Sequence, residues 1–225
     1  MDNIDVTSVL NTIAGVLISL LIFAGVSFLF SLISFSVLKR HPKTYIFANL
    51  PVIIYPYAYL LVALLAGQGA AVTGQSGIID FILPIALVLL FLLIHPMCLA
   101  TVIVNFRAAH MNIIPPDKLA NGILLVKLIH VPAFILHFIL GSLGVLASVW
   151  GLGIIMFAVV IDLLTVIGSG TYTVAAITGL CRQNVINRWT GVLFGILSYI
   201  YCVDVAAAIV LKVIVNKKLN SEDEQ

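Results

Sequence analysis

Six runs of apolar residues, separated by short polar breaks, follow one another along the chain. They lie near residues 8–38, 45–66, 79–104, 121–141, 149–178 and 190–212. A spanning helix needs about 20 largely apolar residues, because inside hydrocarbon every backbone N–H and C=O must be bonded within its own segment. The pattern predicts an all-α, polytopic transmembrane bundle of six helices. Residues 1–215 would form this single domain, and residues 216–225 a short polar C-terminal tail.

Basic residues are concentrated in alternate connections between these runs. Lysine and arginine occur in the connections at 39–44, 105–120 and 181–189, whereas those at 67–77 and 141–148 carry no charge. Since short loops rich in Lys and Arg stay in the cytoplasm, we expect the three basic connections on the cytoplasmic side. Six crossings would then leave both termini outside.

The lysines near the C-terminus disagree with this topology. Lys212, Lys217 and Lys218 would become external if the last run crossed the membrane, although acidic residues follow them closely. Five or seven crossings would move the C-terminus to the other side. We keep six helices as the prediction and treat the side of the C-terminus as its open point.

Composition supports a membrane protein and limits its other partners. Hydrophobic residues make up 62% of the 225 positions and charged residues 9%, which leaves almost nothing for a soluble domain. The net charge of +2 is too small and too scattered to indicate nucleic acid binding, and three cysteines imply no disulfide framework. The expected partners are the lipid bilayer, a small solute or ion, and other membrane subunits.

Pro56, Pro96 and Pro132 lie well inside predicted helices 2, 3 and 4, whereas Pro51 and Pro84 lie in the first turns of helices 2 and 3. Each of the first three removes one helical hydrogen bond and leaves the carbonyl four residues earlier without its usual donor. Neighbouring protein or water must then supply a donor, so we expect these kinked positions to face the bundle interior. The kinks either act as hinges or only shape the packing.

The fourth run carries ionisable groups where the chain should be in lipid. Lys127, His130, Phe134 and His137 follow the spacing i, i+3, i+7 and i+10, which places them along one face of a helix. A charged side chain at the bilayer centre costs about 2.5 to 3.5 kcal/mol. We therefore expect this face to contact protein or water.

Two carboxylates are the candidate partners of this face, and their depths predict which partner each takes. Lys127 lies about 9 Å and His130 about 14 Å from the start of helix 4 near residue 121. Asp162 lies about 10 Å from the same membrane edge, counted across a core of about 30 Å. The first predicted polar layer therefore joins Lys127 and His130 with Asp162.

The second predicted layer lies deeper. His137 is about 24 Å from the start of helix 4, and Asp204 is about 21 Å from the start of a continuous helix 6 near residue 190. Tyr201, one turn from Asp204, is a further neighbour. Asp162 and Asp204 are the primary site candidates, since a short acidic side chain cannot reach the membrane surface.

Helix 5 continues a polar face from Asp162 through Thr165, Ser169 and Thr173. Such a face either lines a hydrated cavity or consists of hydroxyls that bond back to their own helix, and the second interpretation is the commoner one. Thr165 and Ser169 are therefore supporting candidates only.

These features predict transport or permeation of a small solute or ion, with Asp162 and Asp204 as protonatable groups and His130 and His137 as neighbours that titrate near neutral pH. The alternative is a non-catalytic interaction protein or accessory subunit whose polar layers fix helix register. An intramembrane enzyme ranks third, because Ser169 in IGSGT lacks the GxSG spacing and no HExxH, GxGD or Walker A motif occurs. No metal or cofactor is expected, since His130 and His137 stand about 10 Å apart.

Short patterns in the second half, KLIHVPAFI at 127–135 and YCVDVAAAI at 201–209, resemble uncharacterised small polytopic membrane proteins of Gram-positive bacteria. The resemblance implies a bacterial cytoplasmic membrane and no particular activity.

Overall fold

The computed structural model describes residues 6–73, 76–146 and 151–223, and the regular structure in these ranges is entirely helical. The elements are α1 (Val6–Arg40), the short 3-10 helix η1 (Pro42–Thr44), α2 (Tyr45–Ala48), α3 (Leu50–Thr73), α4 (Ser76–His110), α5 (Pro116–Leu146), α6 (Leu152–Arg182), α7 (Arg188–Leu197) and α8 (Val203–Asp223). The predicted all-α class is confirmed.

Within the described ranges, five helical segments are long and apolar enough to cross a membrane. They are Leu17–Arg40, Pro42–Leu61, Val88–His110, Pro116–Leu146 and Leu152–Arg182. α5 and α6 have 31 residues each, or about 46 Å. Because this exceeds the roughly 30 Å hydrocarbon core, both helices must tilt in a bilayer or extend beyond it.

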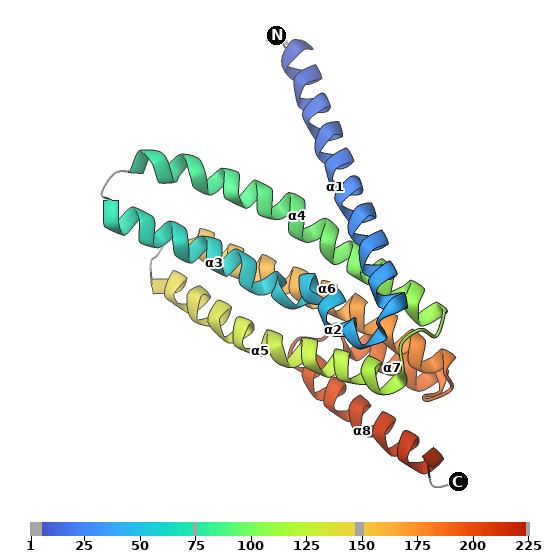
Figure 1. Ribbon diagram of the computed structural model, residues 1–225. Coiled ribbons are helices and arrows are strands. Elements are labelled where there is room, and N and C mark those ends of the chain that lie inside the picture. The colour runs from blue at the N-terminus through green and yellow to red at the C-terminus, as the bar shows by residue number, and fades with distance from the viewer. Residues whose placement is uncertain (1–5, 74–75, 147–150, 224–225) are drawn as a thin grey trace.

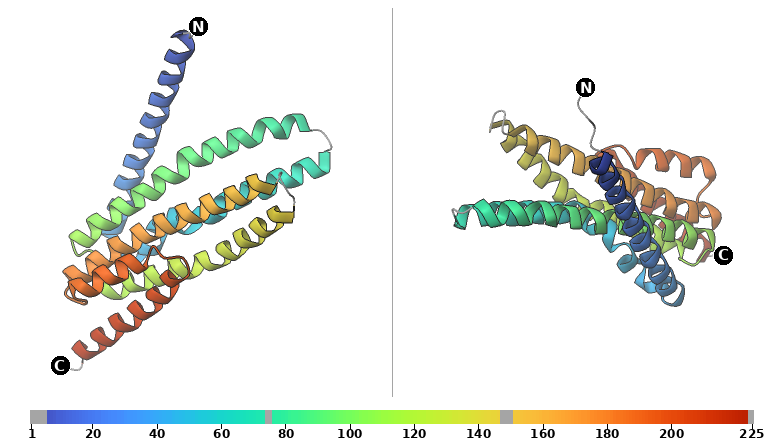
Figure 2. Two further views of the ribbon diagram at one scale, coloured as in Figure 1. Left: turned by 180° about the vertical axis from the view of Figure 1, so that it is seen from behind. Right: turned by 90° about the horizontal axis from the view of Figure 1, so that it is seen from above.

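α3, α4, α5 and α6 run side by side, with α5 and α6 packed as an antiparallel hairpin (Figure 1). α1 contacts α4 through its second half, where the Arg107 guanidinium lies 4.5 Å from the centre of the Phe35 ring. Its first half leaves the bundle and ends far from the other helices in Figure 1 and in the left view of Figure 2. Leu17 and Leu21 on this half are exposed.

The prediction of a sixth spanning helix at 190–212 is wrong. α7 ends at Leu197, residues 198–202 form a turn, and α8 begins at Val203. Cys202 in this turn has a φ of 65°, a left-handed conformation that few non-glycine residues adopt. The turn contains no glycine or proline, so the apolar pattern alone gave no signal of a break.

α8 returns toward the end of the bundle from which α7 entered, and it runs antiparallel to α5. Asp204 at its start contacts Lys127 of α5, and Lys212 further along lies within electrostatic reach of Asp117 near the α5 N-terminus. Figure 2 shows α8 leaving the bundle at that end. α7 and α8 therefore form a helical hairpin in place of one continuous helix.

One face of α8 packs into the bundle as far as Val215, through Ala208 and Leu211. The opposite face, with Ile209 and Val213, is exposed. Residues 216–223, within the predicted polar tail, continue α8 as a helix beyond the last buried position.

Candidate functional site

The polar face of α5 points into the protein, as predicted. The side chains of Lys127, His130, Phe134 and His137 are all buried. They meet residues of α3, α6 and the α7–α8 hairpin, so the fourth apolar run carries its ionisable groups toward partners rather than toward lipid.

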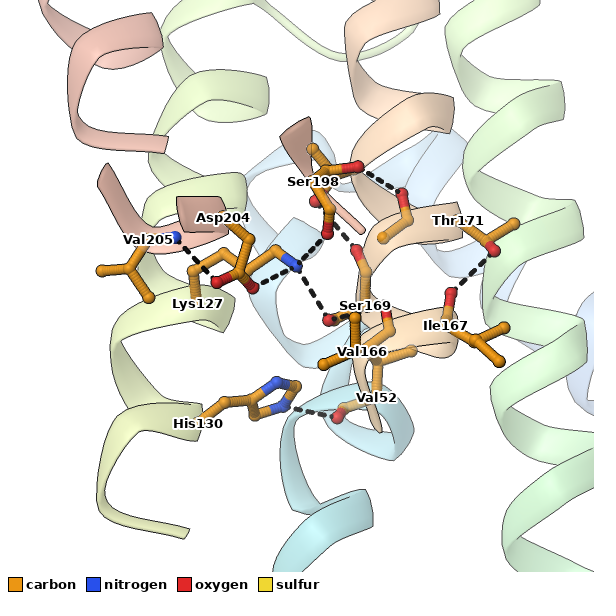
Figure 3. Close-up of polar contacts among 12 residues, drawn as sticks. Val52, Lys127, His130, Val166, Ile167, Ser169, Thr171, Ser198, Asp204 and Val205 are labelled. Carbon is orange, nitrogen blue, oxygen red and sulfur yellow. Dashed lines mark hydrogen bonds and ion pairs between the residues drawn. The ribbon is translucent and has the colours of Figure 1, made fainter. Parts of the chain in front are cut away.

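Lys127 is the centre of the site (Figure 3). Its Nζ atom lies 2.8 Å from Asp204 Oδ2 and donates to Ser169 Oγ at 2.9 Å and to the Ser198 carbonyl at 3.1 Å. Ser169 and Ser198 thus accept hydrogen bonds from the ammonium group, whereas Asp204 Oδ2 forms an ion pair with it and has no hydrogen-bond partner. The side chains of Lys127 and Asp204 are each only 1% exposed.

The two half-helices of the hairpin place their ends at this ion pair. Ser198 follows the last residue of α7, and its carbonyl faces the Lys127 ammonium. Asp204 lies in the first turn of α8, where its Oδ1 atom accepts from the Val205 N–H at 2.9 Å. Since a helix carries partial negative charge at its C-terminus and partial positive charge at its N-terminus, each half-helix stabilises the charge that it meets.

A second pair lies further along the α5–α6 hairpin. His137 Nδ1 and Asp162 Oδ1 are 2.5 Å apart, with the histidine side chain fully buried and the aspartate 21% exposed. The other ring nitrogen of His137, Nε2, is buried without a hydrogen-bond partner. Asp162 is therefore the carboxylate of the two that retains some access from outside the protein.

Both predicted polar layers contain the wrong carboxylate, because Asp162 and Asp204 are exchanged between them. Asp162 pairs with His137 rather than with Lys127 and His130, and Asp204 pairs with Lys127 rather than with His137. One cause is the turn between α5 and α6. The uncharged segment 141–148 suggested an external loop, but α5 remains helical to Leu146. His137 and Asp162 then lie nine and ten residues from the facing helix ends, at matching depth.

The other cause is the break before α8. A continuous helix from residue 190 would have carried Asp204 past Lys127 to the level of His137. Instead, α7 extends about 15 Å and stops. Lys127 lies 11 residues into α5, also about 16 Å, so the reversal of the chain places Asp204 beside it.

His130 bonds to the carbonyl that one of the prolines leaves without its usual donor. Its Nε2 atom lies 2.9 Å from the Val52 carbonyl, four residues before Pro56. This is the carbonyl that Pro56 cannot bond, and the prediction that neighbouring protein would satisfy it is confirmed. The hydroxyl of Tyr57 donates to the Ile129 carbonyl, three residues before Pro132, whereas the carbonyl that Pro132 leaves without its usual donor is that of Leu128.

α3, α4 and α5 run through Pro56, Pro96 and Pro132 as continuous helices. Pro56 and Pro96 are buried, whereas Pro132 is exposed, so the prediction that all three face the bundle interior is wrong for Pro132. The carbonyl of Pro96 accepts from Ser27 of α1 at 3.1 Å. A role of these prolines as hinges stays a prediction.

The supporting residues divide between the two interpretations of the α6 face. Thr165 and Thr173 bond back to carbonyls of their own helix, at 2.7 and 2.8 Å. Ser169 also holds Lys127. Tyr201 packs its ring edge-on against Phe134 with centroids 4.9 Å apart, so it borders the site mainly through aromatic contact.

Two hollows adjoin the ion pair. One of about 130 Å³ is lined by residues of α3, α4 and α6 that include His95 and Ser169. The other, of about 300 Å³, lies against Tyr201 and Asp204. Lys127 lines neither hollow, but its ammonium group contacts Ser169 of the first and Asp204 of the second.

A cluster around His95 was not predicted as part of a site. The hydroxyl of Tyr55 lies 3.0 Å from His95 Nε2, and that of Tyr59 lies 3.2 Å from Nδ1. Tyr55 and Tyr59 are four residues apart on α3, a spacing that marks one helix face. That spacing was the available signal, but nothing in the sequence indicated that α4 would bring His95 to it. Among the described residues, no three His, Cys, Asp or Glu side chains are grouped so as to hold a metal ion.

Residues 41–218 match a family of unknown function, DUF6652, and the chain belongs to this family. No curated protein and no solved structure matches the chain. The matched region contains α2 through most of α8, and hence every residue of the site described above.

Proposed function

We propose that this member of the DUF6652 family is a multi-pass membrane protein that moves a small solute or ion across the bilayer, with its binding site where α5, α6 and the α7–α8 hairpin meet. The observation that carries the proposal is the buried Lys127–Asp204 pair at the ends of two half-helices. Helices broken near the membrane centre are the form in which many transporters bind ions and substrates.

The chemistry of the site favours a cation. Lys127 Nζ is held by a carboxylate, a hydroxyl and a backbone carbonyl, from Asp204, Ser169 and Ser198. Oxygen donors of these types also bind hard cations. Lys127 therefore acts as a built-in cation, and an incoming cation, either a metal ion or a proton, displaces its ammonium group from the Asp204 carboxylate.

Two hollows and a second protonatable pair near Lys127 support this displacement step. The hollows lined by Ser169 and by Asp204 each adjoin a residue that the Lys127 ammonium contacts. The His137–Asp162 pair, about 15 Å further along α5, supplies a second protonatable group with partial access from outside. Movement of the lysine is the opening event in this proposal.

We extend the proposal to location and sidedness. In line with the resemblance to Gram-positive membrane proteins, the proposed location is a bacterial cytoplasmic membrane, with the connections 39–44, 105–120 and 181–189 in the cytoplasm. The α7–α8 hairpin supports this sidedness, because α8 leaves the bundle at the end that carries these connections. Lys217 and Lys218 then lie on the cytoplasmic side, as the positive-inside rule expects.

The test is ion flux into proteoliposomes that contain the purified full chain. A trapped pH-sensitive dye reports protons and a trapped sodium-sensitive dye reports Na⁺, each driven by an imposed gradient. We expect the wild-type chain to pass at least one of these ions faster than empty liposomes do. The double variant Lys127→Gln/Asp204→Asn, which keeps hydrogen-bonding groups but removes both charges, should lose that flux.

The chain offers a matched control for this variant. Asp117 and Lys118 form an exposed pair at 3.7 Å, so Asp117→Asn/Lys118→Gln removes the same two charges away from the site. It should retain full flux. A wild-type chain that passes neither ion, or a control variant that loses flux equally, contradicts the cation pathway.

A second candidate function is that of an accessory or interaction subunit, and α1 is the observation that favours it. The first half of this helix presents apolar side chains such as Leu17 and Leu21 away from the bundle. Neutralising Asp162 and Asp204 separates the two candidates. A transporter loses flux or its pH dependence, whereas for an interaction subunit the wild-type chain already shows no flux for the variant to change.

A further inference from the structure

An open groove runs between α6 and α7, on a part of the molecule that the proposed transport site does not use. It encloses about 750 Å³, within the roughly 300 to 1,000 Å³ typical of ligand pockets. Its α6 wall contains Val174, Ile177 and Thr178, and its α7 wall contains Val192 and Ile196. The walls are thus mainly apolar along most of their length.

A close approach of α7 to α6 and a contact between two hydroxyl groups define the course of the groove and its inner end. A Cβ atom on Gly191 would lie 2.5 Å from Cys181 Sγ, so α7 approaches α6 closely at this point. At the inner end, the hydroxyls of Tyr199 and Thr171 lie 3.0 Å apart and join the two walls. From Arg188 to Tyr199 the groove follows 11 residues, or about 16 Å. This is about half the 30 Å hydrocarbon core, the depth of one leaflet.

The mouth of the groove is positively charged. Arg182 ends α6 and Arg188 begins α7, and both line the groove with exposed side chains. Neither forms an ion pair with any residue that the structure describes. Two guanidinium groups are well suited to bind a phosphate through paired hydrogen bonds, and the α7 N-terminus adds partial positive charge.

We propose that this groove binds one anionic phospholipid from the leaflet at the basic end of the bundle. Its phosphate lies between Arg182 and Arg188, and an acyl chain follows the apolar walls toward Tyr199. Charge complementarity selects an anionic headgroup, and the length of the groove selects a lipid over a soluble phosphate. The inference does not depend on transport, although α7 also carries Ser198 to the Lys127 site.

Trp189 provides a reporter for this site. The chain has two tryptophans, Trp150 and Trp189, and Trp189 is 84% exposed beside Arg188. In a Trp150→Phe background, the full chain is reconstituted in phosphatidylcholine vesicles with a minor fraction of brominated phosphatidylglycerol. Parallel vesicles contain the same fraction of brominated phosphatidylcholine. We expect the brominated anionic lipid to quench Trp189 severalfold more strongly.

Two kinds of variant assign the effect to the groove. Arg182→Gln/Arg188→Gln should abolish the excess quenching by the anionic lipid, whereas Lys39→Gln/Arg40→Gln, which removes two charges at the end of α1, should preserve it. Gly195→Phe places a ring in the groove without changing the charge, and it should reduce the excess. Circular dichroism of each variant verifies that α7 is still folded, and Gly195→Leu replaces the phenylalanine variant if it is not.

Three results would overturn the proposal. Equal quenching by the two brominated lipids excludes headgroup selection, and equal loss in the Lys39→Gln/Arg40→Gln variant assigns the effect to general surface charge. Displacement of the brominated lipid by soluble glycerol phosphate at a matched concentration excludes the acyl chain and leaves a simple anion site.

Discussion

At the scale of single residues, the free energy of unfolding depends on whether the buried Lys127–Asp204 pair keeps both of its charges. Both side chains are almost completely buried and 2.8 Å apart. Removing one partner of such a pair leaves an uncompensated buried charge and costs about 3 to 5 kcal/mol. We predict that Lys127→Met and Asp204→Asn each lower the free energy of unfolding by about this amount. The double variant should be more stable than either single variant, and additive losses measured by chemical denaturation in detergent would refute this.

A second prediction at this scale concerns His130. Its Nε2 atom supplies the hydrogen bond to the Val52 carbonyl that Pro56, which has no N–H, cannot form. Replacing His130 with Phe leaves that carbonyl unsatisfied, at a cost of about 1 to 3 kcal/mol. In a Pro56→Ala background, residue 56 regains its own N–H, so the same replacement should cost clearly less. A thermal double-mutant cycle measures the difference. His137→Phe, whose partner is on α6, is the control and should cost the same in both backgrounds.

At the scale of elements, the sequence predicted those features that depend on side-chain pattern. The polar face from Lys127 to His137 is set by helical spacing alone, and its burial follows from the cost of charge in lipid. The pairing of the charges depends on where helices stop, which the pattern specifies poorly. The segment 141–148 is rich in glycine and serine yet begins as helix, whereas 198–202 contains neither glycine nor proline yet breaks one.

The next prediction concerns the turn between α7 and α8, at residues 198–202. Cys202 has a φ of 65°, a conformation that costs a non-glycine residue roughly 1 to 2 kcal/mol and glycine almost nothing. Cys202→Gly should therefore raise the thermal unfolding temperature of the purified protein. Cys202→Ala keeps the Cβ atom and should give no such increase. If both variants behave alike, the gain does not come from the backbone of the turn.

At the scale of the whole molecule, the proposed arrangement of five crossings and one re-entrant hairpin predicts the side of each chain end. The hairpin returns α8 to the end of the bundle where α5 begins and α6 finishes. A C-terminal tag and a tag inserted in the connection 183–187 should thus be accessible from the same side of sealed membrane vesicles. A tag inserted at 147–150 should be accessible only from the other side. If instead the C-terminal tag is labelled together with the 147–150 tag, residues 190–212 cross the bilayer and Asp204 moves away from Lys127. That single result would remove both the hairpin and the cation site built at its turn.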